Sequence, residues 1–166
     1  VFTVMDRRRK IELEIMQRTF EAAKGRINML LLGEDLGGQN SPLISKKMYE
    51  KHIKPRHKEF VELAKSFNAK VMMHSDGAIS HFYDDFIEIG IDVHDAVQIE
   101  TNGMDPERIQ KYWGDKICFH GAVPVTGPLC FGTVEEIKEQ TKKIINTLGQ
   151  NGGYILSPSH DVQDNT

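Results

Sequence analysis

The sequence predicts an α/β protein in which five parallel strands alternate with helices. Apolar runs that are too short for helices alternate with longer stretches of helical periodicity. Capping residues and glycines separate many of these segments. Such alternation requires a parallel sheet covered by helices, and two architectures satisfy it: an open doubly wound sheet, or part of an eightfold barrel.

Five short segments have the composition of buried strands. The first is the clearest, because four consecutive apolar residues end directly at Gly33. The third is assigned to a strand although it contains Asp92, His94 and Asp95. The predicted strands span residues 29–32, 70–73, 91–97, 116–119 and 154–156.

Five stretches before and between the strands have helical periodicity. Thr133 and Glu136 form a capping box, and Asp105 followed by Pro106 is a favourable helix start. Pro55 lies inside one stretch, where it predicts a kink or a division into two shorter helices. The predicted helices cover residues 6–23, 45–67, 79–89, 133–148 and a short segment that starts at residue 105.

Composition excludes several function classes. The chain has 166 residues and a formal net charge of −3, which gives no reason to expect nucleic-acid binding. No apolar stretch approaches the ~20 residues that cross a bilayer, and a signal peptide before the fold is not expected. Cys118 and Cys130 belong to no CxxC pair, which favours the reducing cytoplasm. Both ends look cut, so residues 1–166 are expected to be a single-domain fragment.

A polar or titratable residue follows every predicted strand. The carboxyl ends of parallel strands meet at one edge, where the active sites of both architectures lie. Residues that converge there would therefore form a site. They are Glu34 and Asp35 after the first strand, His74 and Asp76 after the second, Gln98 and Glu100 after the third, His120 after the fourth and His160 after the fifth.

The segment His74-Ser75-Asp76-Gly77 is the sharpest local unit. His74 and Asp76 point to the same side of an extended chain, and imidazole with carboxylate can bind a divalent metal or relay a proton. His160 would complete a set of two histidines and one carboxylate. In the alternative interpretation, Asp76 caps the next helix and His74 bonds to backbone. Among the other histidines, His57 is expected at the surface and His94 either in the core or at the rim.

Ordered motifs run through the chain from about residue 10. They are Leu32-Gly33-Glu34-Asp35-Leu36-Gly37, Ile53-Lys54-Pro55-Arg56, His74-Ser75-Asp76-Gly77, Gly90-Ile91-Asp92, Met104-Asp105-Pro106-Glu107, Phe119-His120-Gly121, Phe131-Gly132-Thr133 and the segment 152–160. In this order they resemble the uroporphyrinogen decarboxylase superfamily. The resemblance implies a (β/α)8 TIM barrel, of which this chain supplies the C-terminal half, about strands 4 to 8 with their helices.

The resemblance implies one of two activities. One branch of the superfamily removes carboxylates from porphyrinogens in porphyrin biosynthesis without a cofactor. The other comprises zinc-dependent methyltransferases that move methyl groups between corrinoid proteins and a thiol or a pterin. Those methyltransferases usually use a histidine and two cysteines; here His74 matches the histidine, while Asp76 and His160 replace the cysteines with harder ligands. Asp76 and His160 match the decarboxylase pattern, from which His74 departs.

We therefore expect a metal-assisted, methyltransferase-like enzyme. The metal, expected to be zinc, is held by His74, Asp76 and His160. The expected catalytic residues are Asp76, His160 and Glu34, and those expected to contact substrate are Asp35, Gln98, Glu100 and His120.

Two other functions remain open at this stage. One is a cofactor-free uroporphyrinogen decarboxylase, in which Asp76 and His160 orient the substrate and manage protons. The other is a ligand-binding barrel without catalysis. The expected partners are a small molecule (a corrinoid, a thiol or a porphyrinogen), a corrinoid protein and a second copy in a homodimer, with neither nucleic acid nor a membrane.

Overall fold

Five parallel strands in sequence order form the centre of the computed structural model, which describes residues 2–164. Every neighbouring pair is parallel, so the sheet has the topology of consecutive strands in a β/α barrel. The predicted fold class, a partial barrel, is confirmed. The strands are β1 (Met29–Gly33), β2 (Lys70–His74), β3 (Val93–Val97), β4 (Cys118–Val123) and β5 (Tyr154–Pro158).

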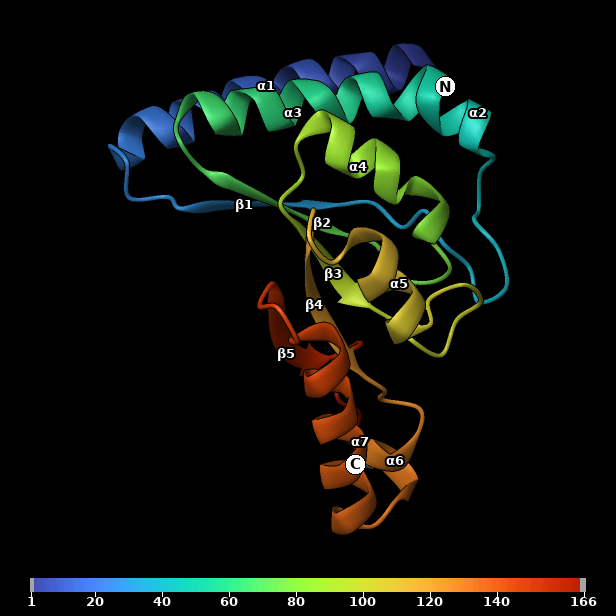
Figure 1. Cartoon of the computed structure of the whole chain (residues 1–166). Coiled ribbons are helices and arrows are strands. Elements are labelled where there is room, and N and C mark those ends of the chain that lie inside the picture. The colour runs from blue at the N-terminus through green and yellow to red at the C-terminus, as the bar shows by residue number, and fades with distance from the viewer. Residues whose placement is uncertain (1, 165–166) are drawn as a thin grey trace.

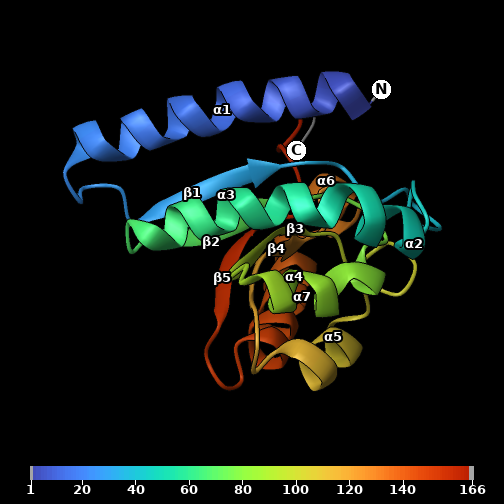
Figure 2. The same cartoon turned by 90° about the horizontal axis from the view of Figure 1, so that it is seen from above.

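Helices connect the strands and pack beside them (Figure 1). Seen from above, α1 runs alongside α3 at the β1 edge of the sheet (Figure 2). In order, the helical segments are α1 (Phe2–Ala23), α2 (Lys46–Met48), η1 (Tyr49–Ile53), α3 (Lys54–Ser66), η2 (Ser80–Phe82), α4 (Tyr83–Ile89), α5 (Pro106–Trp113), α6 (Pro128–Phe131) and α7 (Val134–Leu148). None of them, within residues 2–164, combines the length and apolar character that a membrane crossing requires.

Several helix ends follow the local signals in the sequence. Thr133 and Glu136 form both bonds of the capping box, and the carboxylate of Asp105 accepts from the amide of Arg108. The division expected at Pro55 is present, because a π-helical turn, η1, separates α2 from α3. Pro55 lies in the first turn of α3, where its missing N–H leaves no helical bond unmade.

Two helical segments and several boundaries differ from the prediction. The first helix begins at Phe2, and β4 continues to Val123, so His120 lies within that strand and not after it. The helix predicted over 79–89 is divided into the 3-10 segment η2 and α4. The segment α6 was not predicted, because four residues are too few for a 3.6-residue period to be visible in the sequence.

The core fills the space between the sheet and its helices, and two histidines belong to it. His57 is buried, contrary to the expected surface position, because it continues the buried face of α3 that includes Phe60, Val61 and Ala64. His94, which the sequence places either in the core or at the rim, is fully buried in the core. Its Nδ1 lies 2.9 Å from the hydroxyl of Tyr83 and its Nε2 lies 3.0 Å from a backbone carbonyl oxygen.

The opposite face of the sheet leaves apolar side chains open to solvent. Leu31 of β1 is 59% exposed, and Ile155 of β5 is also exposed. β1 and β5 are the two edge strands, and each pairs with one neighbour. Unpaired edges beside apolar surface are sites of association.

We predict that this chain associates in solution through the β1 edge. Leu31→Lys should shift the mass measured by light scattering towards that of a monomer, because a charge at an edge strand opposes pairing. Ile11→Lys is the matched control, since Ile11 is 54% exposed but lies on α1. A wild-type chain that is monomeric at high concentration would contradict this prediction.

A second prediction concerns pH. Burial lowers the pKa of His94 to about 4. The unfolded chain binds this proton near pH 6.5 and the folded chain only near pH 4, so stability is lost as the pH falls through that window. The loss is roughly 3 kcal/mol. Denaturant unfolding at several pH values should show a smaller loss for His94→Gln than for wild type; equal losses would show that His94 does not carry the effect.

Candidate metal and active site

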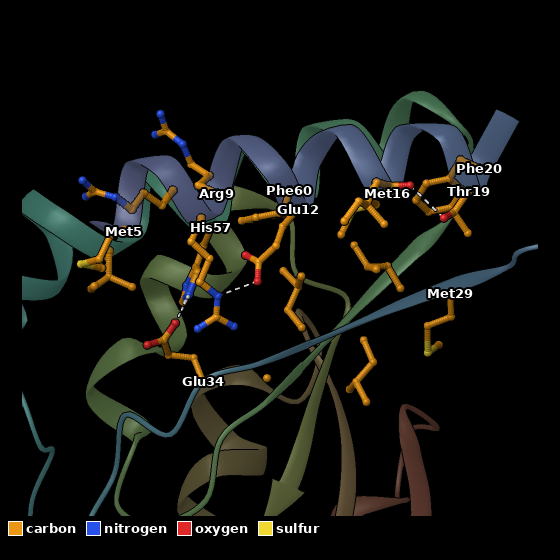
Figure 3. Close-up of a pocket in the computed structure, with 18 of the residues that line it drawn as sticks. Met5, Arg9, Glu12, Met16, Thr19, Phe20, Met29, Glu34, His57 and Phe60 are labelled. Carbon is orange, nitrogen blue, oxygen red and sulfur yellow. Dashed lines mark hydrogen bonds and ion pairs between the residues drawn. The ribbon is translucent and has the colours of Figure 1, made fainter. Parts of the chain in front are cut away.

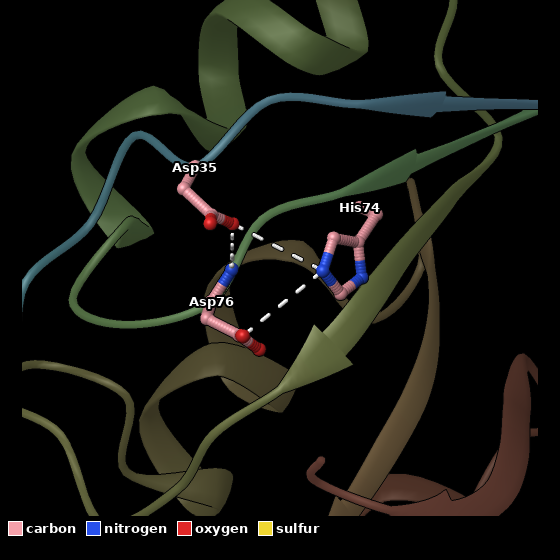
Figure 4. A group of neighbouring side chains, drawn as sticks. All are labelled: Asp35, His74 and Asp76. Atoms are coloured by element: carbon pink, nitrogen blue, oxygen red, sulfur yellow. Dashed lines mark hydrogen bonds and ion pairs between the residues drawn. The ribbon is translucent and has the colours of Figure 1, made fainter. Parts of the chain in front are cut away.

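Three potential metal ligands meet where β1 and β2 end (Figure 4). Asp35 follows β1, His74 ends β2, and Asp76 lies two residues later. One ligand atom from each lies within 4.8 Å of the others. His74 Nε2 is 3.9 Å from Asp35 Oδ1 and 4.0 Å from Asp76 Oδ2. Gly33 of β1 pairs with His74 of β2, so the two strands end at the same level of the sheet and the residues that follow them lie side by side.

Close packing of two loops holds this group together. A Cβ on Gly37 would lie 2.4 Å from the carbonyl oxygen of Asp76, and one on Gly77 would lie 2.6 Å from the carbonyl carbon of Gly37. Gly77 also has a φ of +84°, which side chains other than glycine rarely adopt. The glycines after β1 therefore allow backbone to approach backbone, and the amide of Ala78 donates to the carbonyl of Gly38 at 2.8 Å.

The carboxylate of Asp76 is not fully hydrogen-bonded within residues 2–164. Its Oδ1 is buried and has no hydrogen-bond partner among the described residues. Burial raises the pKa of Asp76; His74 and His160 oppose the shift, and the negative charge of Asp35 adds to it. A cation would supply the missing partner. One imidazole and two carboxylates fit zinc, and also iron or manganese.

His160, the third predicted metal ligand, lies at the same rim. Its Nε2 is 3.7 Å from Asp76 Oδ2, and its side chain is 52% exposed. It contacts one member of the group and stands outside the set formed by Asp35, His74 and Asp76. The structure thus places Asp35, predicted to contact substrate, among the potential metal ligands.

Asp95 is the site residue that the sequence analysis missed. Its Oδ2 lies 2.8 Å from His74 Nδ1, and its Oδ1 bonds to Nδ1 of His120. Burial would raise the pKa of Asp95, but hydrogen bonds from the two histidines outweigh burial and lower it. The signal in the sequence is a charged residue inside a strand, between Val93 and Val97, rather than after its end.

Gln98 and Glu100 make contacts that organise the rim. The side-chain oxygen of Gln98 accepts from the amide of Gly77 at 3.1 Å. Glu100 accepts from the hydroxyls of Thr126 at 3.2 Å and Ser159 at 3.4 Å. These bonds tie the loop after β3 to its neighbours, and contact with substrate stays a prediction for both.

Glu34 belongs to a different environment from Asp35. It faces a cavity of about 740 Å³ between α1, α3 and β1, where its Oε2 lies 3.6 Å from His57 Nε2 (Figure 3). The neighbouring imidazole of His57 lowers the pKa of Glu34 against the effect of burial, and the charge of Arg8 acts in the same direction. A catalytic role for Glu34 stays a prediction.

Comparison with known proteins agrees with the fold. The family model for uroporphyrinogen decarboxylase matches residues 28–166. Among solved structures, the chain is similar to a methyltransferase from Methanosarcina mazei, with a TM-score of 0.62 and 18% identity over 81% of this chain. It spans 36% of that structure's chain. No curated protein matched. The match over most of the chain, together with the shared fold, shows that this chain belongs to the uroporphyrinogen decarboxylase family.

Proposed function

We propose that this chain forms part of the active site of a metal-assisted methyltransferase. The reaction would move a methyl group between a corrinoid or another donor and a thiol or a pterin. The observation that carries the proposal is the convergence of Asp35, His74 and Asp76, together with the buried Oδ1 of Asp76, which has no hydrogen-bond partner in the described part of the chain. The methyltransferase of similar fold supports methyl transfer as the reaction class.

The residues of the rim have separable roles in this proposal. His74 supplies a nitrogen ligand through Nε2, and Asp35 and Asp76 supply oxygen ligands. His160 lies close enough to Asp76 to join them or to contact substrate. A divalent ion bound there, zinc in the first instance, would lower the pKa of a thiol and favour the thiolate nucleophile. A corrinoid protein as partner, a homodimer and a cytoplasmic location are further parts of the proposal.

One observation favours a second candidate, a cofactor-free uroporphyrinogen decarboxylase. Burial raises the pKa of Asp76, so this carboxyl group keeps its proton to higher pH than an exposed one. A carboxylic acid beside His160 could deliver a proton to the carbon that loses CO2. That role needs no metal.

The metal content of the purified chain separates the two candidates. After loading with zinc and desalting, we expect near-stoichiometric metal by mass spectrometry in wild type, and loss of it in His74→Ala, because the only imidazole of the three-ligand set is removed. His81→Ala is the control, since His81 is exposed on η2. Wild type without metal would contradict methyl transfer assisted by this site, and turnover of uroporphyrinogen would then support the decarboxylase.

The loop crossing gives a further prediction. Gly77→Ala should weaken zinc binding by about tenfold, because its Cβ would push the two loops apart and misplace the ligands. Gly25→Ala is the matched control: its φ of +79° imposes the same backbone strain, about 1–2 kcal/mol, but its Cβ would meet open space. Both variants should lose stability in denaturant unfolding. Equal zinc affinity in the two variants would show that the crossing does not position the ligands.

A further inference from the structure

Asp95 is shared between two histidines on neighbouring strands. It lies on β3, with His74 on β2 and His120 on β4. Each carboxylate oxygen takes one imidazole: Oδ2 contacts His74 and Oδ1 contacts His120. The side chain of Asp95 is 15% exposed, so both interactions lie largely out of bulk water.

The bonding pattern determines the form of both imidazoles. A carboxylate only accepts hydrogen bonds, so the nitrogen that faces each oxygen must carry the hydrogen. Both contacts are made by Nδ1. In a neutral imidazole with hydrogen on Nδ1, the lone pair lies on Nε2. The Nε2 of His74 is the atom that faces Asp35 and Asp76.

We propose that Asp95 is a positioning residue that sets the same tautomer in His74 and His120, so that the site contains two imidazoles with a lone pair on Nε2. The part that concerns His74 rests on the proposed function, since its Nε2 is the metal ligand. His120 needs no metal: its Nε2 accepts a hydrogen bond from a ligand that carries an S–H, O–H or N–H group, as a thiol or a pterin does. His120 thereby keeps its predicted contact with substrate.

Two equivalent acceptors are the property that only a carboxylate supplies. An asparagine at this position has one oxygen, which accepts, and one amide nitrogen, which donates. Its nitrogen would have to donate to Nδ1 of one histidine, which forces the hydrogen of that ring onto Nε2. Asp95→Asn therefore keeps the shape of the side chain and reverses one of the two imidazoles.

Asp92, which directly precedes β3, provides a matched control. It is 21% exposed in its side chain, and it bonds to Lys70, Lys65 and the amide of Val71 at the opposite end of the sheet. Asp92→Asn removes a partly buried carboxylate of similar exposure without touching either histidine.

The tautomers can be read from long-range nitrogen–proton NMR spectra of the 15N-labelled chain at mildly alkaline pH. His74→Gln and His120→Gln assign the two rings. We expect hydrogen on Nδ1 in both rings of wild type and of Asp92→Asn, and on Nε2 in one ring of Asp95→Asn. Hydrogen on Nε2 of either ring in wild type, or unchanged rings in Asp95→Asn, would overturn the proposal; the wild-type spectrum decides even if the variant fails to fold.

Zinc affinity, measured by competition with a chromophoric chelator, distinguishes this proposal from the proposed function. If His74 is the reversed ring in Asp95→Asn, affinity should fall by about 10–100-fold, the usual cost of losing the support of a metal-bound histidine. If His120 is reversed, affinity should stay near wild type. Wild type that binds no zinc but has both expected tautomers would refute the metal site while supporting the role of Asp95. A reversed His74 with unchanged affinity would refute its role as the metal ligand through Nε2.

Discussion

The close crossing of the loops that follow β1 and β2 is the constraint on which the candidate site depends. Gly37 and Gly77 bring two backbones together at a distance that no side chain would allow. Asp35 precedes one of these glycines by two residues, and Asp76 directly precedes the other. The carboxylates of Asp35 and Asp76 therefore lie close together because the two loops are in contact. That contact requires glycine at both positions, since a Cβ on either residue would overlap the backbone of the other loop. A rim that places two acids together also creates repulsion, which an opposing charge has to offset.

Asp76 and Asp95 show how differently the same rim treats two carboxylates. Both are partly buried, and burial alone would raise the pKa of each. Asp95 has a hydrogen-bonded imidazole on each oxygen, and its pKa is lowered. Asp76 has a buried oxygen that no hydrogen bond reaches within residues 2–164, and its pKa is raised. Asp95, whose two oxygens are both hydrogen-bonded, is suited to orient other groups. Asp76 is suited to receive a cation or a proton. That difference is the physical basis for assigning them separate roles.

Local signals predicted the fold better than the site. The short apolar runs, the capping box at Thr133 and the proline at position 55 each act within a few residues, so the strands, that helix start and the division before α3 were predictable. The pairing of Asp95 with two histidines depends on strand register, which the sequence does not display. The burial of His57 has another cause: a polar residue type predicts the surface, but its position continues the apolar face of the helix.

The two consecutive acids after β1 illustrate why residue type alone does not define a site. Asp35 joins His74 and Asp76, whereas Glu34 pairs with His57, whose Nδ1 lies 3.2 Å from the hydroxyl of Tyr49. The chain Glu34–His57–Tyr49 links the end of β1 to α3 and η1. Since His57 and Tyr49 are buried, this link restrains the point at which β1 leaves the sheet. The position of Asp35 in the candidate metal site is thus determined from both sides, by the loop crossing at Gly37 and by the anchoring of its neighbour.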